Sequence, residues 1–215
     1  MFELRGVQFK GILHIPDLEI EEGAVTSIVG SSGSGKTTLL RMLNKMISPD
    51  RGTIYWQSRD LADLDAVDLR RQVVMLGQRP VIFPGTVADN LQLGRQLADQ
   101  ASAEEGALRQ VLAQVALDKA LEESAKDLSG GEGQRLALGR ILLMDPAVYL
   151  LDEPSSALDE QTAVEVIGAL VRQVRAKGKT LVMVTHAPAI AESYSDRIIS
   201  LEHGRVKACR ELAHG

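Results

Sequence analysis

A glycine-rich segment near the start of the chain has the spacing needed to surround a phosphate group. It runs Gly30-Ser31-Ser32-Gly33-Ser34-Gly35-Lys36-Thr37, is followed by Thr38, and fits the pattern G-x-x-x-x-G-K-[ST]. Glycines let backbone N–H groups turn toward phosphate oxygens, and a helix that begins here adds partial positive charge. Lys36 can reach the terminal phosphates of a nucleotide, and the Thr37 hydroxyl can bind Mg²⁺. This phosphate loop (residues 30–37) predicts a nucleotide site but by itself leaves GTPases, kinases and helicases open.

Two adjacent carboxylates follow an apolar run in the second half of the chain, in the segment Val148-Tyr-Leu-Leu-Asp-Glu-Pro154. The run predicts a buried strand, so Asp152 and Glu153 should emerge at its C-terminal end, where α/β proteins bind ligands. Paired carboxylates at a strand end are commonly part of a solvated turn. A phosphate loop in the same chain favours a functional site instead.

A second glycine-rich segment, Ser129-Gly-Gly-Glu132, lies between the loop and the carboxylates. It matches a capping box, with serine at the N-cap and glutamate three residues later, and this explains Ser129 and Glu132 without a ligand. It does not explain Gly130 and Gly131, because each glycine costs up to ~1 kcal/mol in a helix. Close approach of a phosphate to the backbone would explain both glycines.

The hydrophobic pattern predicts the elements that must hold these segments. Residues 36–46 and 163–174 carry helical stripes, and residues 86–144 predict an inserted helical lobe. The strand, helix, strand order of residues 147–185 implies a parallel, right-handed crossover. Strand-like runs occupy residues 2–9, 12–20, 25–29, 53–56, 73–76, 147–151 and 180–185, with a terminal hairpin at 198–201 and 205–208.

We therefore predict an α/β fold in a single domain, residues 1–215. Residues 1–85 and 145–215 form a core with a mixed, largely parallel sheet and a small antiparallel β part, and residues 86–144 form the helical lobe.

Composition narrows the class of protein. A net charge of −5 with both signs interspersed argues against a general nucleic-acid binder. Cys209 is the only cysteine, which excludes an internal disulfide and suits a reducing cytosol. No apolar run approaches the ~18 residues that span a bilayer, and the first residues lack a signal-peptide pattern. Any membrane role is therefore expected to depend on a partner.

The order of the three segments resembles one family in particular. The stretch Leu128-Ser-Gly-Gly-Glu-Gly-Gln-Arg135, here called the signature stretch, lies between the phosphate loop and Val148-Tyr-Leu-Leu-Asp-Glu-Pro154. This arrangement resembles the ATP-binding subunit of an ABC transporter over nearly the whole chain. The resemblance implies a P-loop ATPase whose signature stretch binds the γ-phosphate of ATP held by another protomer. Two copies would face head to tail around two ATP molecules and drive a separate membrane permease.

The resemblance also gives roles to single residues. Asp152 resembles the Walker B aspartate that holds Mg²⁺, and Glu153 the carboxylate that activates the attacking water. Gln78 resembles the Q-loop glutamine that contacts Mg²⁺ or water and senses the permease. His186 resembles the switch histidine on the γ-phosphate, and Asp159 the D-loop aspartate at the dimer interface. Without the family context, each of Gln78, His186 and Asp159 would be a surface polar residue.

Within the family, three short segments look closest to two small groups of ATPases. The segments are Leu40-Arg-Met-Leu-Asn-Lys45, Leu69-Arg-Arg-Gln-Val73 and Gly85-Thr-Val-Ala-Asp-Asn-Leu91. One group is the ATPase of the Fet-type iron exporter and its plant aluminium-tolerance relative, and the other is the phosphate-importer ATPase. The short chain favours the first, which implies metal-ion export and a cytoplasmic position on the inner face of the membrane.

Other functions fit the same motifs less well. An ABC ATPase that energises a cell-division or lipoprotein-release complex is the main alternative. A DNA-repair or translation ATPase would carry coiled coils or a tandem domain, and a GTP switch would carry Asn-Lys-x-Asp, which is absent here. The family usually places an aromatic residue near the second strand to stack on adenine. Here Phe9 is followed by Lys10-Gly11-Ile12, which looks several residues short, so base recognition stays open.

Overall fold

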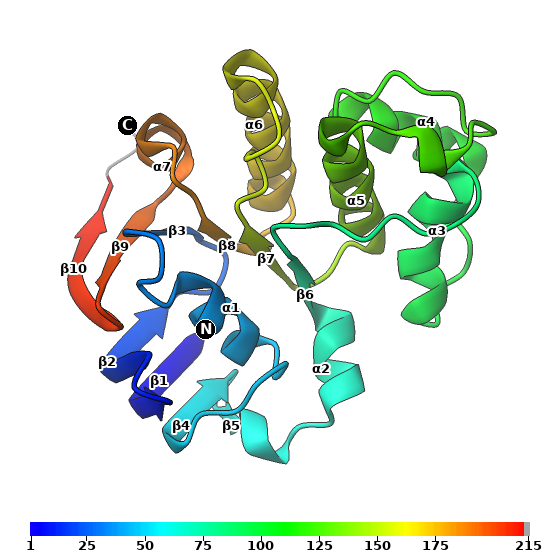
Figure 1. The fold of residues 1–215 in the computed structure, drawn as a ribbon. Coiled ribbons are helices and arrows are strands. Elements are labelled where there is room, and N and C mark those ends of the chain that lie inside the picture. Colours follow the sequence, from blue (N-terminus) through cyan, green and yellow to red (C-terminus); the bar gives the residue numbers. More distant parts are fainter. Residues whose placement is uncertain (213–215) are drawn as a thin grey trace.

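A computed structural model describes residues 1–212 of the chain (Figure 1). Its first sheet has four antiparallel strands in the order β2-β1-β4-β5. The strands are β1 (Phe2–Phe9), β2 (Leu13–Ile20), β4 (Arg51–Trp56) and β5 (Arg59–Asp60). This sheet is the antiparallel β part that the sequence predicts, with β5 added at its edge.

The second sheet holds the strands that lead to the candidate site. Its order is β10-β9-β3-β8-β7-β6, and all neighbours are parallel except the pair β9 and β10. The helix α6 (Glu160–Ala176) connects β7 to the parallel strand β8, which confirms the predicted parallel crossover. The strands are β3 (Val25–Val29), β6 (Val73–Leu76), β7 (Val148–Asp152), β8 (Thr180–Val184), β9 (Arg197–Glu202) and β10 (Arg205–Glu211).

The central strands β7 and β8 are buried along their whole length and mainly apolar, because both faces of this sheet are covered. Val148 and Leu150 of β7 belong to a core shared with α1 (Lys36–Leu43) and the antiparallel sheet. Tyr149 and Leu151, which alternate with them, belong to a core shared with α6 and the helical lobe. Successive strand residues point to opposite faces, so β7 joins the two halves of the molecule.

The helical lobe contains α3 (Val87–Leu97), α4 (Glu105–Gln114) and α5 (Gly130–Met144), and it lies to one side of the six-stranded sheet (Figure 1). The helix predicted for residues 36–46 is shorter than expected. It ends at Leu43 because Lys45 adopts a left-handed φ of 55°, and Met46 is exposed instead of buried. The sequence did not predict α2 (Ala66–Gln72), α7 (Pro188–Tyr194) or the 3-10 turns Leu61–Asp63 and Ala125–Asp127.

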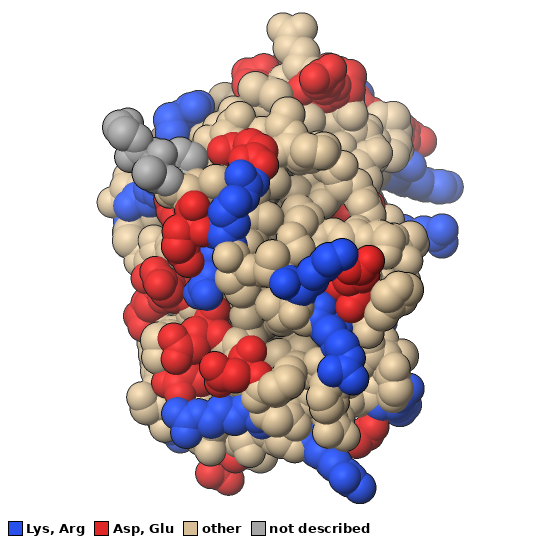
Figure 2. All heavy atoms as spheres, turned by 90° about the vertical axis from the view of Figure 1, so that its left-hand side faces the viewer, with Lys and Arg blue, Asp and Glu red and all other residues tan. Residues whose placement is uncertain are grey.

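The edge of the six-stranded sheet at β10 is highly charged. Figure 2 shows acidic and basic side chains interspersed on this side of the molecule. Arg205, Lys207, Arg210 and Glu211 are exposed on β10, and charges on an edge strand oppose pairing with another chain. None of the helices within residues 1–212 is both long and apolar enough to cross a membrane.

Candidate functional site

The phosphate loop joins the end of β3 to the start of α1, as the sequence predicts. Gly35 is the N-cap of α1 with φ 101°, and Gly30 has φ 151°. A Cβ on Gly30 would lie 2.1 Å from the Leu201 carbonyl oxygen, so only glycine fits there. Ser31, Ser32 and Gly33 are exposed, whereas Ser34 is buried and its hydroxyl has no hydrogen-bond partner within residues 1–212.

Lys36 lies back across this loop. Its Nζ donates to the carbonyl oxygens of Gly30 at 2.9 Å and Ser31 at 2.8 Å. Burial lowers the pKa of Lys36, and the nearby charges of Glu153 and Asp152 partly offset that effect. The ammonium group is therefore held at the mouth of the loop, where an anionic phosphate would be a stronger partner than two carbonyls.

Asp152 is the last residue of β7 and is only 3 % exposed. Burial raises the pKa of Asp152, and a hydrogen bond from the Thr37 side chain opposes that rise. The first hydroxyl of α1 and the buried carboxylate therefore face each other. Together they form a set of hard oxygen donors suited to Mg²⁺.

Glu153 meets two of the other predicted residues. Gln78 Nε2 donates to Glu153 Oε2 at 3.0 Å, and His186 Nε2 lies 3.1 Å from Glu153 Oε1. Gln78, Glu153 and His186 follow β6, β7 and β8, which are adjacent in the sheet. The C-terminal ends of parallel strands share one edge, so these residues form a single cluster beside the phosphate loop.

The backbone of Glu153 is fixed in an uncommon conformation. Its φ is 52°, a left-handed value that costs a non-glycine residue roughly 1–2 kcal/mol. Its N–H donates to the Val184 carbonyl at 3.0 Å, and its own carbonyl accepts from Gln134 Nε2 at 2.9 Å. These two bonds hold the strained residue with its carboxylate toward Gln78 and His186.

Gln134 is the residue that sequence reasoning missed. It lies on α5 and is 2 % exposed, and it connects the helix of the signature stretch directly to Glu153. The sequence places Gln134 within the signature stretch but contains no signal for this contact, which depends on where the fold places α5 relative to the residue that follows β7.

The signature stretch forms the capping box that its sequence predicts. Glu132 N donates to Ser129 Oγ at 3.3 Å, and Ser129 N donates to Glu132 Oε2 at 2.8 Å. The hydrogen bond from the Ser129 backbone is the main cause that lowers the pKa of Glu132 to about 2, and Lys119 adds to it. Within residues 1–212, no hydrogen bond or ion pair links Ser129, Gly130, Gly131 or Glu132 to the phosphate loop.

The two glycines of the stretch have different surroundings. A Cβ on Gly131 would lie 2.8 Å from the Ala157 carbonyl oxygen, whereas a Cβ on Gly130 would enter open space. Packing within the chain therefore explains Gly131. It does not explain Gly130, for which the approach of an external group stays the prediction.

Asp159 caps a helix. As the N-cap of α6, its carboxylate accepts from Thr162 N at 3.0 Å and from Thr162 Oγ1 at 2.6 Å. These bonds lower the pKa of Asp159, with the Thr162 hydroxyl as the largest cause. The place of Asp159 at a dimer interface stays a prediction.

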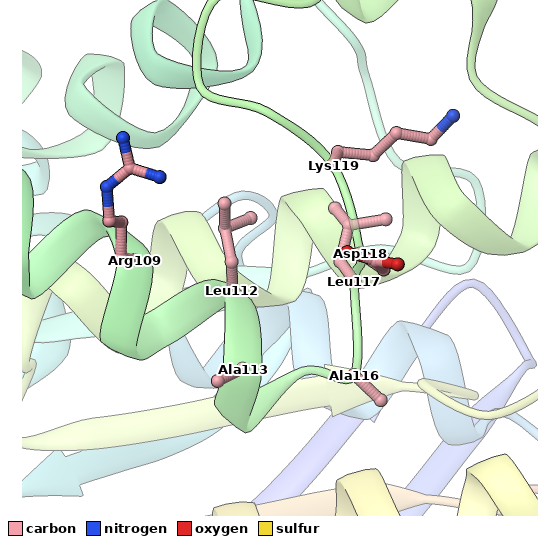
Figure 3. A pocket seen from close by; sticks show the side chains of 7 residues that line it. All are labelled: Arg109, Leu112, Ala113, Ala116, Leu117, Asp118 and Lys119. Atoms are coloured by element: carbon pink, nitrogen blue, oxygen red, sulfur yellow. The ribbon is translucent and has the colours of Figure 1, made fainter.

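Other cavities in the described residues lie outside this cluster, among them the following two. Half-buried Phe9 lines a pocket of about 540 Å³, and the Lys10 ammonium lies 5.1 Å from the centre of its ring. A pocket of about 390 Å³ lies against α4 and the loop that follows it (Figure 3). Asp118 is the only carboxylate that lines the second pocket, and it has no acidic or histidine partner there, so we do not place the hydrolytic site in it.

The family model described as ABC transporter matches residues 13–156. The chain belongs to the ABC transporter family. Rice Protein STAR1 (Oryza sativa subsp. japonica) is 40 % identical over 95 % of this chain, which spans 58 % of its length. The L-cystine transport system ATP-binding protein TcyN of Escherichia coli K12 is 38 % identical over 91 % of the chain and 82 % of its own length.

Solved structures of ABC cassettes share this fold. The dimeric, post-hydrolysis structure of the ATP-binding cassette MJ0796 with ADP and Pi has a TM-score of 0.90 and 28 % identity, and the match covers 100 % of both chains. The chain is thus an ABC ATPase, and the expected P-loop fold is confirmed.

Proposed function

We propose that this ABC ATPase is the ATP-hydrolysing subunit of a membrane transporter and that it works as a head-to-tail dimer around two ATP molecules. One observation carries this proposal: among the residues that the structure describes, the signature stretch presents an open helix terminus at Gly130 and has no hydrogen bond or ion pair to the chain's own phosphate loop. A helix N-terminus suits an anion. The similarity to the cassette MJ0796, whose solved structure is dimeric, supports a dimer. Residues 1–215 would act as one domain, with the helical lobe at 86–144 presenting the signature stretch.

The phosphate loop would bind the triphosphate of ATP through its backbone N–H groups and Lys36, with Thr38 at the next position of α1. Lys36 would leave the carbonyls of Gly30 and Ser31 for the phosphate oxygens. Thr37, Asp152 and Gln78 would hold Mg²⁺, and the buried carboxylate beside a hydroxyl fits a hard cation. When bound, Mg²⁺ neutralises charge that develops on the phosphates.

Glu153 would act as the general base. A water molecule attacks the γ-phosphorus, its proton passes to the Glu153 carboxylate, and the bond to the ADP oxygen breaks. His186 and Gln78, which already contact Glu153, would orient that carboxylate and the γ-phosphate. Loss of the γ-phosphate removes the link to the partner's Ser129, Gly130, Gly131 and Glu132, so the protomers separate. Asp159 would lie at their interface.

The membrane subunit is a second part of the proposal. We infer a cytoplasmic ATPase that docks on the inner face of the membrane through a separate permease, because the relatives named above include an ATP-binding protein of a transport system. The permease selects the substrate, and metal-ion export is our proposal from the short segments around Leu40, Leu69 and Gly85. An ATPase that energises a non-transport complex would instead co-purify with a membrane protein carrying a large extracytoplasmic domain.

The test of the composite site uses two substitutions. Glu153→Gln should slow ATP hydrolysis by at least about 100-fold while ATP binding persists, and it should trap an ATP-dependent dimer visible by light scattering. Ser129→Arg in the same background should abolish the dimer while one protomer still binds nucleotide. Normal turnover by Glu153→Gln would overturn the base assignment, and dimers that persist with Ser129→Arg would overturn the composite site.

A further inference from the structure

The loop that follows Gln78 is attached to the helical lobe by one half-buried guanidinium group. Arg140 lies on α5, and its Nη1 donates to the Val81 carbonyl oxygen at 3.0 Å. Its Nε and Nη2 donate to the backbone oxygen and Oδ1 of Asn90 on α3, both at 2.8 Å. The guanidinium carbon also lies 4.9 Å from the centre of the Phe83 ring. A single side chain therefore holds two helices and the loop together.

Asn90 completes this attachment. It is 1 % exposed, and its Oδ1 accepts from Phe83 N while its Nδ2 donates to the Phe83 carbonyl, both at 2.9 Å. Ile82 packs on α5, where a Cβ on Gly133 would lie 3.3 Å from Ile82 Cγ1. The segment from Val81 to Phe83 is therefore fixed to the helical lobe through its backbone, its ring and its aliphatic side chain.

The charge of Arg140 is not balanced by a carboxylate. Its acceptors are two backbone carbonyls and one amide oxygen, and no ion pair involves Arg140 within residues 1–212. Burial lowers the pKa of Arg140. A charge that is partly withdrawn from water without a counter-ion stabilises a fold poorly. The geometry of the guanidinium group explains an arginine at this place better than its charge does, because its N–H donors reach three acceptors at once.

The other end of the loop reaches the catalytic cluster. Gln78 Nε2 contacts Glu153 Oε2, and three residues of chain span at most about 10 Å from Gln78 to Val81. The same helix α5 begins at the signature stretch and contacts the Glu153 carbonyl through Gln134. Helix α5 is thus connected to Glu153 twice: to its backbone directly and to its carboxylate through Arg140, the loop and Gln78.

We propose that Arg140 is a positioning residue that makes Gln78 move together with α5. When a partner's nucleotide displaces the signature stretch, the same displacement would reach the bond between Gln78 and Glu153. This inference rests on the proposed role of Glu153 in hydrolysis. It adds a mechanical link through which binding of the partner's nucleotide to the signature stretch would affect the position of the Glu153 carboxylate.

The experiment is a double-mutant cycle on the full chain, with ATP and Mg²⁺, in which kcat and KM are measured. Arg140→Lys keeps the positive charge but loses the fork. It should lower kcat at least about fivefold with KM within about twofold, because small displacements of positioned groups are costly to the reaction. In a Gln78→Ala background, the same substitution should change kcat less than about twofold. Arg95→Lys is the matched control.

Arg95 suits this control because it has the same kind of bonds elsewhere in the lobe. It lies on α3 and donates to the carbonyls of Ala101 at 2.7 Å and Leu143 at 3.0 Å. Like Arg140, it has no ion pair within residues 1–212. Among the same residues, its hydrogen bonds do not involve the loop from Val81 to Phe83. Arg95→Lys should leave kcat within about twofold in both backgrounds.

Equal losses of kcat from Arg140→Lys in both backgrounds would overturn the inference, since they would show a role independent of Gln78. If Gln78→Ala and Glu153→Gln both hydrolyse ATP normally, the proposed function itself fails. Hydrogen exchange gives a readout that needs no activity: the Phe83 amide should exchange at least about tenfold faster in Arg140→Lys and unchanged in Arg95→Lys. If Arg140→Lys does not fold, Asn90→Asp replaces it in the same double-mutant cycle and is expected to give the same pattern of kcat values. Asn90→Asp removes the Nδ2 group that donates to the Phe83 and Thr86 carbonyls.

Discussion

Alanine at the two adjacent glycines of the signature stretch should have opposite effects on stability. At Gly131 the new methyl group would lie 2.8 Å from the Ala157 carbonyl oxygen, a backbone atom that cannot move away cheaply. At Gly130 the methyl group would have no neighbour within 4 Å beyond its own helix and adjacent residues. Both residues lie in the first turn of α5, so helix propensity changes in the same way for both.

The size of the difference follows from two effects. Replacing glycine by alanine in a helix gains roughly 0.5–1 kcal/mol, which is the whole effect expected for Gly130→Ala. Gly131→Ala makes the same gain but must also displace a carbonyl, which costs about 1–3 kcal/mol. The two variants should therefore differ by roughly 2 kcal/mol in the free energy of unfolding, or ~4–8 °C in Tm. Gly130→Ala should be the more stable.

Urea unfolding followed by circular dichroism measures this difference. A second assay measures ATP-dependent dimers in a Glu153→Gln background. Gly130→Ala should lose the dimer in that background although its fold is more stable than that of the parent. That combination would identify Gly130 as a glycine required by a ligand. If both variants lose stability equally, the packing explanation is refuted. If Gly130→Ala dimerises as readily as its parent, the approach of a phosphate to Gly130 is refuted.

Two further predictions concern residues with a capping role. Asp159→Ala should lower Tm by ~2–4 °C through loss of the α6 cap. Asp159→Asn should keep Tm, because asparagine also caps helices, but it should lose the ATP-dependent dimer if the carboxylate lies at the interface. Equal Tm values for the two variants would contradict the capping role. Glu132 has a pKa lowered to about 2 from 4.5, so its ionised form stabilises the fold above pH 4.5 and this contribution is lost as the pH falls toward 2. The Tm difference between wild type and Glu132→Gln should shrink over that range in thermal scans, and a difference independent of pH would show that the capping carboxylate is not the cause.

Local sequence patterns predicted some elements to the residue and others not at all. The strands at Val25–Val29 and Val73–Leu76 have the predicted bounds, because each is a short apolar run that is buried in the sheet. The short helices α2 and α7 have 7 residues each and bury at most two of them. Such short helices leave little periodic hydrophobic signal in the sequence. For α2, a helix-start signal was nevertheless present: Asp65 is the N-cap, and its carboxylate accepts hydrogen bonds from Val67 N and Asp68 N.

The sequence by itself determined which segments are the candidates for the chemistry. The phosphate loop, Asp152 with Glu153, and the capping box are each a few consecutive residues, so their spacing alone sets their local geometry. Only the tertiary structure decided that Gln78 and His186 both reach Glu153, although Gln78 and Glu153 are 75 positions apart. It also decided that Gln134 and Arg140 connect α5 to this cluster. Strand order and helix packing bring such distant residues together, and these are properties of the whole fold that no short stretch of sequence contains.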